Sequence, residues 1–164
     1  MATYKLITSY TSTGENIITL SSIPQTYTDL VIKFSAKGSA NNQYDLVRVY
    51  VNGTSDNAGG AVHMGFPNYS ATYNFMNAAY TADAANSANV FGPIEYYLPN
   101  YAKPSVQKSF LLLGGAEQQT SSIQNFLGGI LTTQTGAITS LSFDGEYGSF
   151  LNNTTIYLYG ILAS

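Results

Sequence analysis

Alternation of apolar and polar side chains is the dominant pattern of this chain, and it is clearest over residues 30–35. The even positions of this segment are Leu, Ile and Phe, and the odd positions are Val, Lys and Ser. Because successive side chains of a β-strand point to opposite faces, the pattern predicts a strand with one wholly apolar face. We expect that face to cover a core, and the face with Lys33 to meet solvent or a partner. Pro24 has no N–H and a fixed φ, which predicts a turn or edge before this strand.

The same pattern recurs along the chain and predicts further strands, separated by clusters of turn residues. They cover residues 4–10, 16–20, 45–51, 93–98, 108–115, 125–132, 138–143 and 154–162, with short strands also expected at 61–66 and 71–76. Asn52-Gly53 is a strong signal for a tight hairpin turn. The nearly continuous apolar run 108–115 is typical of a central strand, and Gly128-Gly129 indicates a bulge or a close backbone approach. The first and last strands are expected to lie side by side.

About nine to eleven short strands and no capped amphipathic helix predict an all-β protein. The expected fold is a jelly-roll-like antiparallel β-sandwich, and the length suits a single domain over residues 1–164. Residues 55–91 are rich in Ala, Asn and Gly and form the least regular region, so we expect a long irregular insertion there.

Charge is sparse, and this narrows the choice of partners. Only 9% of the residues are charged, against about 25% in ordinary domains, and the six basic residues are scattered in a chain of net charge -3. A nucleic-acid surface needs clustered Lys and Arg, so none is expected. No apolar stretch is long enough for a bilayer, and the N-terminus lacks a secretory signal, so synthesis in a cytosol is expected. A nearly neutral chain with 14 tyrosines suits a domain covered by neighbours in an assembly, although a β-rich composition alone can also be neutral.

Candidate chemistry is weak. His63 is the only histidine and there is no cysteine, so the sequence offers no triad, no zinc ligand cluster and no thiol chemistry. Asp144 and Glu146 lie two residues apart at a predicted turn, which favours solvated loop charges over a catalytic carboxylate pair. We therefore expect no enzyme activity, no metal and no cofactor.

Aromatic side chains are the candidate contact residues, because Tyr offers a large contact area at low entropic cost. Those in the irregular segment can stack on sugars, pack on a protein neighbour or pack on their own domain, and the sequence leaves these alternatives open. The candidates are Tyr4, Tyr10, Tyr50, Tyr69, Tyr73, Phe75, Tyr80, Tyr157 and Tyr159.

Four segments resemble a group of small structural proteins of tailed bacteriophages, of the kind found in phages of cyanobacteria and marine bacteria. They are the start at 1–11 (MATYKLITSYT), the segment 22–34 (SIPQTYTDLVIKF), the segment 94–101 with its Leu-Pro-Asn-Tyr, and the ending 155–161 (TIYLYGI). The resemblance covers the framework from end to end, and it does not extend to 55–91. It implies a β-sandwich component of the virion, with no catalytic residues to carry over.

The resemblance and the composition together give one expected function and one alternative. The first is a capsid decoration, or cement, protein on the outer surface of the virion. It would be trimeric, made in the cytoplasm of the bacterial host, and bound to the major capsid protein or to other virion proteins. The alternative is a tail-fibre or receptor-binding domain that recognises host surface glycans through Tyr69, Tyr73 and Tyr80.

Overall fold

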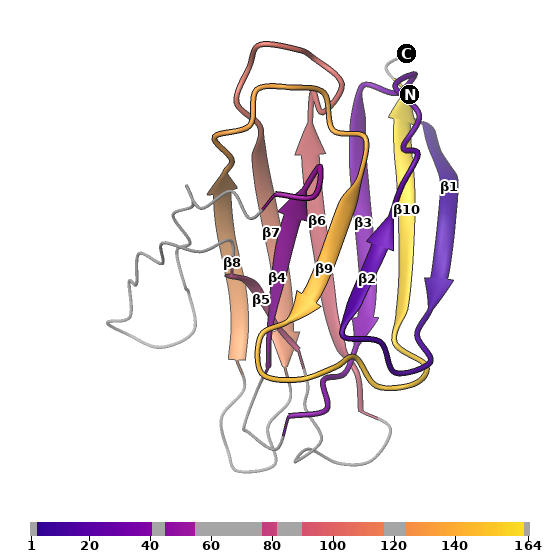
Figure 1. The fold of residues 1–164 in the computed structure, drawn as a ribbon, viewed down its shortest axis with the longest axis vertical. Helices are drawn as coiled ribbons and strands as arrows, with labels where there is room; N and C mark the ends of the chain where they lie inside the picture. The colour runs from indigo at the N-terminus through magenta and orange to yellow at the C-terminus, as the bar shows by residue number, and fades with distance from the viewer. Residues whose placement is uncertain (1–2, 41–44, 55–76, 82–89, 117–123, 163–164) are drawn as a thin grey trace.

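The computed structural model describes residues 3–40, 45–54, 77–81, 90–116 and 124–162, and these form a sandwich of two β-sheets (Figure 1). The described residues contain ten strands and no helix. The strands are β1 (Thr3–Thr11), β2 (Ile17–Leu20), β3 (Asp29–Ala36), β4 (Asp45–Val51), β5 (Asn77–Thr81), β6 (Gly92–Pro99), β7 (Ser109–Ala116), β8 (Gln124–Leu131), β9 (Leu141–Gly145) and β10 (Thr155–Leu162). The expected all-β fold is confirmed.

The two sheets are interleaved along the chain. The larger has six strands in the order β1-β10-β3-β6-β7-β8, and the smaller has four in the order β2-β9-β4-β5. All the strand pairs are antiparallel. The chain crosses between the sheets after β1, β2, β3, β5, β8 and β9, which is the interleaving of a jelly roll, and the β7–β8 hairpin widens the larger sheet. The first and last strands pair as expected, and the two chain ends lie close together (Figure 1).

The core lies between the sheets, where the inward-facing side chains of both meet. The even positions of β3 are buried there as the pattern predicts, and the same holds for the valines at 47, 49 and 51 of β4. Phe34 of the larger sheet meets Phe143 of the smaller sheet edge to face, with ring centroids 4.6 Å apart. Such ring pairs add to the hydrophobic gain from burial and help to fix how the sheets stack.

Turn chemistry sets several of the connections. Asn52 and Gly53 both have positive φ, and Val51 and Thr54 exchange backbone hydrogen bonds across them, so a tight turn forms. It is closed by an isolated bridge rather than by a hairpin strand, and β4 pairs instead with β5. Between β1 and β2, the Glu15 carboxylate accepts hydrogen bonds from the hydroxyls of Tyr10, Ser12 and Thr13 and from the Thr13 N–H. These bonds, chiefly those of Ser12 and Thr13, lower the pKa of Glu15 well below its ordinary value.

Several local predictions are wrong. Residues 128–129 pair regularly with β7 and form no bulge, whereas the register shifts at residue 7 of β1 and between Val47 and Arg48 where β4 pairs with β5. The shift in β1 breaks the simple alternation expected over 4–10. The apolar run 108–115 does not form a central strand, because β7 is next to the edge and one of its faces is exposed. The short strands expected at 61–66 and 71–76 lie outside the described residues, and the expected insertion at 55–91 contains β5.

Candidate protein-contact surface

The outer face of the six-stranded sheet, meaning the side turned away from the smaller sheet, carries two rows of side chains that cross all six strands. The strand registers define each row, because directly paired residues point to the same side of a sheet. The first row, called the Tyr97 row, is Leu6, Tyr159, Val31, Tyr97, Leu111 and Gly129. The second row, called the Lys33 row, is Ser9, Tyr157, Lys33, Glu95, Leu113 and Leu127.

One half of this outer face is aromatic. Tyr157 and Tyr159 of β10 are stacked with ring centroids 6.4 Å apart, and the ring of Tyr4 meets Tyr159 edge-on at 6.5 Å. Leu6, which like Tyr4 belongs to the edge strand β1, enlarges the cluster and is 49% exposed. Since the rings contact one another and still face solvent, they form a preordered apolar surface rather than separate mobile side chains.

The other half is made of leucines. Leu111 and Leu113 project from β7, and Leu127 and Leu131 from β8, with 42% to 58% of each side chain exposed. Single exposed leucines are ordinary, but adjoining ones on paired strands form a contiguous apolar patch. This patch is the part of the surface that the sequence did not reveal, because the apolar run of β7 was expected to form a central strand of the sandwich.

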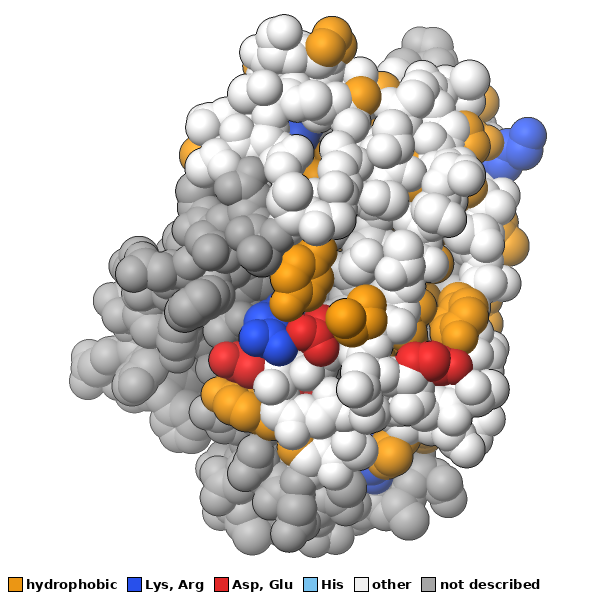
Figure 2. All heavy atoms as spheres, viewed as in Figure 1, with side chains coloured by type: hydrophobic (Ala, Val, Ile, Leu, Met, Phe, Trp, Pro, Cys, Tyr) orange, Lys and Arg blue, Asp and Glu red, His pale blue; other side chains and the backbone are white. Residues whose placement is uncertain are grey.

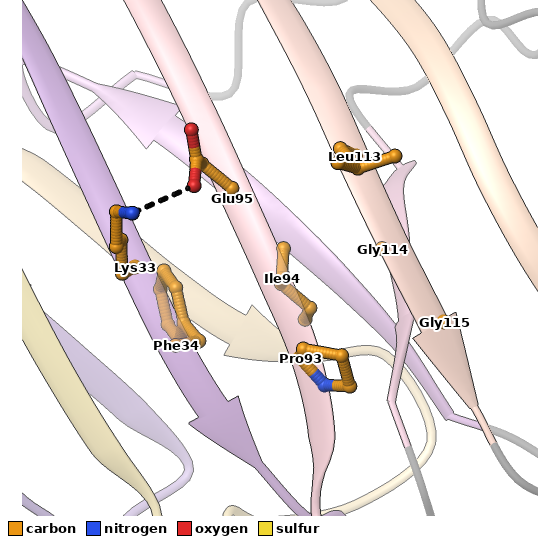
Figure 3. Close-up of a pocket in the computed structure, with 8 residues that line it drawn as sticks. All are labelled: Lys33, Phe34, Pro93, Ile94, Glu95, Leu113, Gly114 and Gly115. Carbon is orange, nitrogen blue, oxygen red and sulfur yellow. Dashed lines mark ion pairs between the residues drawn. The ribbon is translucent and has the colours of Figure 1, made fainter.

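The centre of the outer face holds its ion pair. Lys33 Nζ of β3 lies 3.1 Å from Glu95 Oε2 of β6, and both side chains are about half exposed (Figure 3). Beside the pair, Leu113 and the residues 93 and 114–115 line a shallow depression of about 340 Å³. Val31 is buried although it points outward, because it lies between Tyr159 and Tyr97 in its row.

A second polar group lies at one end of the same face. The Tyr97 hydroxyl donates a hydrogen bond of 2.8 Å to Asp29 Oδ2, and this bond raises the pKa of Tyr97. The backbone N–H of Asn100 donates to the other oxygen of the same carboxylate. Both oxygens of the Asp29 carboxylate therefore accept hydrogen bonds from within the chain.

The outer face of the four-stranded sheet is different in kind. It is mainly neutral and polar, with a few acidic and basic side chains in small clusters (Figure 2). In one cluster Arg48 Nη2 lies 2.6 Å from Asp144 Oδ2, which also accepts a hydrogen bond from the Tyr50 hydroxyl. Burial raises the pKa of Tyr50. Asp144 is buried and bonded at the end of β9, so the expectation of a solvated loop charge is wrong for this residue.

The predicted contact residues divide among several places. Tyr4, Tyr157 and Tyr159 meet on the outer face of the larger sheet, as a contact surface requires. Tyr10 lies at the open edge of the sandwich, where its hydroxyl binds Glu15, and Tyr50 lies on the smaller sheet. The positions 69, 73 and 75 are outside the described residues, and Tyr80 belongs to β5, whose side chains are not described.

No group of three or more His, Cys, Asp or Glu that could hold a metal ion occurs among the described residues. No helix in this part of the chain is long and apolar enough to cross a membrane. His63 lies outside it.

Comparisons with known proteins add little to this description. No protein-family model matches the chain, and no curated protein matches it in sequence. A solved structure of the marine PL-14 alginate lyase from Aplysia kurodai is 10% identical and aligns over 87% of this chain and 72% of its own, with a TM-score of 0.31. A likeness at that level supports no inference about the chain.

Proposed function

We propose that this chain is a structural protein of a tailed-bacteriophage particle, and that it decorates the capsid by burying the outer face of its six-stranded sheet against a neighbouring subunit. The observation that carries the proposal is the pair of apolar rows on that face, with exposed Tyr and Leu side chains around a single ion pair. Solvated sheet faces of monomers carry alternating polar side chains, so a contiguous apolar face favours a covered surface.

The composition of the face supports a protein partner. Interfaces are enriched in aromatic residues and depleted in Lys, Glu and Asp near their centres. The four tyrosines and five leucines of the face fit this description, and the two half-exposed charges of the centre compensate each other. Repetition of one modest contact around a symmetric shell would multiply its effect, which is how a small protein can reinforce a capsid lattice.

Several finer expectations belong to the same proposal. The partner is the major capsid protein or another virion protein, the location is the capsid surface, and the chain is made in the cytoplasm of the bacterial host. The trimer expected of a capsid decoration protein stays a prediction, and the association state of the chain in solution tests it. Recognition of host glycans by a tail fibre is the alternative, and it depends on tyrosines at 69, 73 and 80, whose side chains the structure does not describe.

The test is the copy number of the chain in purified particles of the phage that encodes it, measured against the major capsid protein by quantitative mass spectrometry. About one copy per major capsid subunit supports decoration. A few per cent would refute decoration and favour the tail, where a glycan array would then test sugar binding. Absence from the particles would overturn the virion function altogether.

A matched pair of variants links the test to the proposed surface. Leu111→Asp places a charge in the apolar rows, and Val106→Asp changes an equally exposed apolar residue in the loop before β7. Particles grown with Leu111→Asp should carry at most a tenth of the normal amount, whereas Val106→Asp should be incorporated normally. Equal incorporation of both would show that another surface makes the contact.

A further inference from the structure

The charged and apolar side chains of the outer face are arranged on either side of the line between its two middle strands. The six strands place β3 and β6 at the middle, and the ion pair between Lys33 and Glu95 spans these two strands. We propose that two copies of the chain bind face to face through this surface, related by a two-fold axis that runs along the strands between β3 and β6. The inference rests on the proposed function for the premise that a neighbouring subunit covers the face, and it takes a second copy of this chain, rather than the major capsid protein, as that subunit.

The charges select this axis. A two-fold rotation about it brings β3 of one copy opposite β6 of the other at the same height along the strands, so Lys33 of each copy opposes Glu95 of the second copy. An axis across the strands through the same row would oppose Lys33 with Lys33 and Glu95 with Glu95, which like-charge repulsion disfavours. The face is therefore self-complementary in charge, as a two-fold interface requires.

The apolar halves are complementary about the same axis. β10 of one copy opposes β7 of the other, so Tyr159 meets Leu111, and Tyr157 meets Leu113 beside the depression of about 340 Å³. The aromatic half of each copy thus covers the leucine half of its partner. An aromatic ring set against a shallow apolar depression is the usual form of an interface hot spot.

The outermost strands also fit. β1 opposes β8, which places Leu6 of one copy against the position of Gly129, where the row has no side chain. At one end of the face the residues are small or polar, among them Thr11, Thr155 and Ser35, which align across β1, β10 and β3. A large residue opposite a gap is expected of two surfaces that fit closely, and a polar end is expected of the rim of an interface.

The size of the face is sufficient. Six strands about 4.8 Å apart and four outward rows about 6.6 Å apart give a surface of roughly 500–600 Å² on each copy. The pair would bury about 1,000–1,200 Å², which is above the minimum for a biological interface and just below the standard size of a stable one. Packed sheets cross at about 30°, so the axis is inclined to the central strands by about half of that angle.

The experiment is the association state of the full chain in solution, measured by sedimentation equilibrium from about 1 to 100 μM and by light scattering after gel filtration. The expected species is a dimer with twice the chain mass of 17.6 kDa. Because each substitution counts twice in a two-fold interface, Leu111→Asp should weaken the dimer at least about 100-fold, and the control Val106→Asp should leave it unchanged. Circular dichroism would confirm that both variants are folded.

Charge exchange tests the axis itself. Lys33→Glu or Glu95→Lys alone should weaken the dimer about 10-fold or more, and the double variant Lys33→Glu/Glu95→Lys should restore it. In a mixture followed by native mass spectrometry, the double variant and the wild type should form few mixed dimers, because like charges then oppose each other. Free mixing of the two would overturn the proposed axis.

The remaining outcomes separate this inference from the proposed function. A monomer at 100 μM, a trimer, or a dimer insensitive to Leu111→Asp would overturn the two-fold pairing. If such a chain were still present at about one copy per capsid subunit, the proposed function would stand and the face would be covered by another virion protein. If the chain formed the dimer in solution but were absent from particles, the two-fold pairing would stand and the proposed function would be overturned.

Discussion

Tyr96 offers a direct test of how the core of this sandwich is built, because its hydroxyl is buried and no described residue forms a hydrogen bond with it. The side chain projects from β6 into the space between the sheets, with its ring centroid 5.8 Å from that of Phe34 and 5.7 Å from that of Phe143. Within the part of the chain that the structure describes, no donor or acceptor reaches the hydroxyl, and the residue is fully buried. Burial raises the pKa of Tyr96.

The change Tyr96→Phe removes only that hydroxyl. Burying a hydroxyl without a hydrogen bond costs about 1–3 kcal/mol on the scale of protein mutations. Removing the hydroxyl removes this cost, and the small void left by the oxygen atom offsets the gain by only a few tenths of a kcal/mol. We therefore expect Tyr96→Phe to raise the free energy of unfolding by roughly 1 kcal/mol, which for a domain of this size raises Tm by about 2–4 °C.

Tyr101→Phe is the matched control. Tyr101 is equally buried, but its hydroxyl donates a hydrogen bond to the backbone carbonyl of Pro24. Removing that donor should lower the free energy of unfolding by about 0.5–1.5 kcal/mol. The two variants delete the same atom from the same residue type, so they should shift stability in opposite directions.

The assay is urea unfolding followed by far-ultraviolet circular dichroism, because both variants change the tyrosine fluorescence itself. Equal slopes in urea would show that only stability differs between the proteins. A loss of stability in Tyr96→Phe similar to that in Tyr101→Phe would refute the argument, since it would mean that the Tyr96 hydroxyl makes a favourable contact.

Three further predictions follow from particular contacts. Gly160→Ala should destabilise the fold by about 1–3 kcal/mol, because a Cβ there would run into the ring of Tyr27, whereas Gly136→Ala, with open space around it, should be nearly neutral by thermal melting. Glu15→Gln should lower Tm at neutral pH, and the difference in Tm from the wild type should shrink as the pH falls below about 4. A carboxylate whose pKa is lowered by folding stabilises the fold above its ordinary pKa and loses that effect as it is protonated. A difference in Tm that stayed constant from pH 7 to pH 2 would contradict this explanation. Lys108→Met should lower the free energy of unfolding in urea by about 2–3 kcal/mol, because the buried Nζ donates hydrogen bonds to three backbone carbonyl oxygens. An unchanged unfolding midpoint would show that these hydrogen bonds do not stabilise the fold.

Much of the fold could be predicted from local patterns. The period-two alternation identified most strands and the core face of β3, and Asn52-Gly53 identified a turn, because these features depend on side chains close together in the sequence. The bulge in β1 could not be predicted, since it exists only where β1 and β10 pair with one residue in excess. Asp144 could not be placed either, because Arg48, which binds it, is distant in the sequence.

The candidate surface shows the same division more sharply. The sequence by itself determined that the chain is a β-sandwich with few charges and many tyrosines, and four of those tyrosines share one face. The tertiary structure alone decided that Leu111 and Leu113 are exposed, because a continuous apolar run does not indicate whether a strand is covered on one face or on both. The order of strands in the larger sheet is set by pairings between distant segments, and that order brings the tyrosines of β10 and the leucines of β7 onto one surface with an ion pair between them.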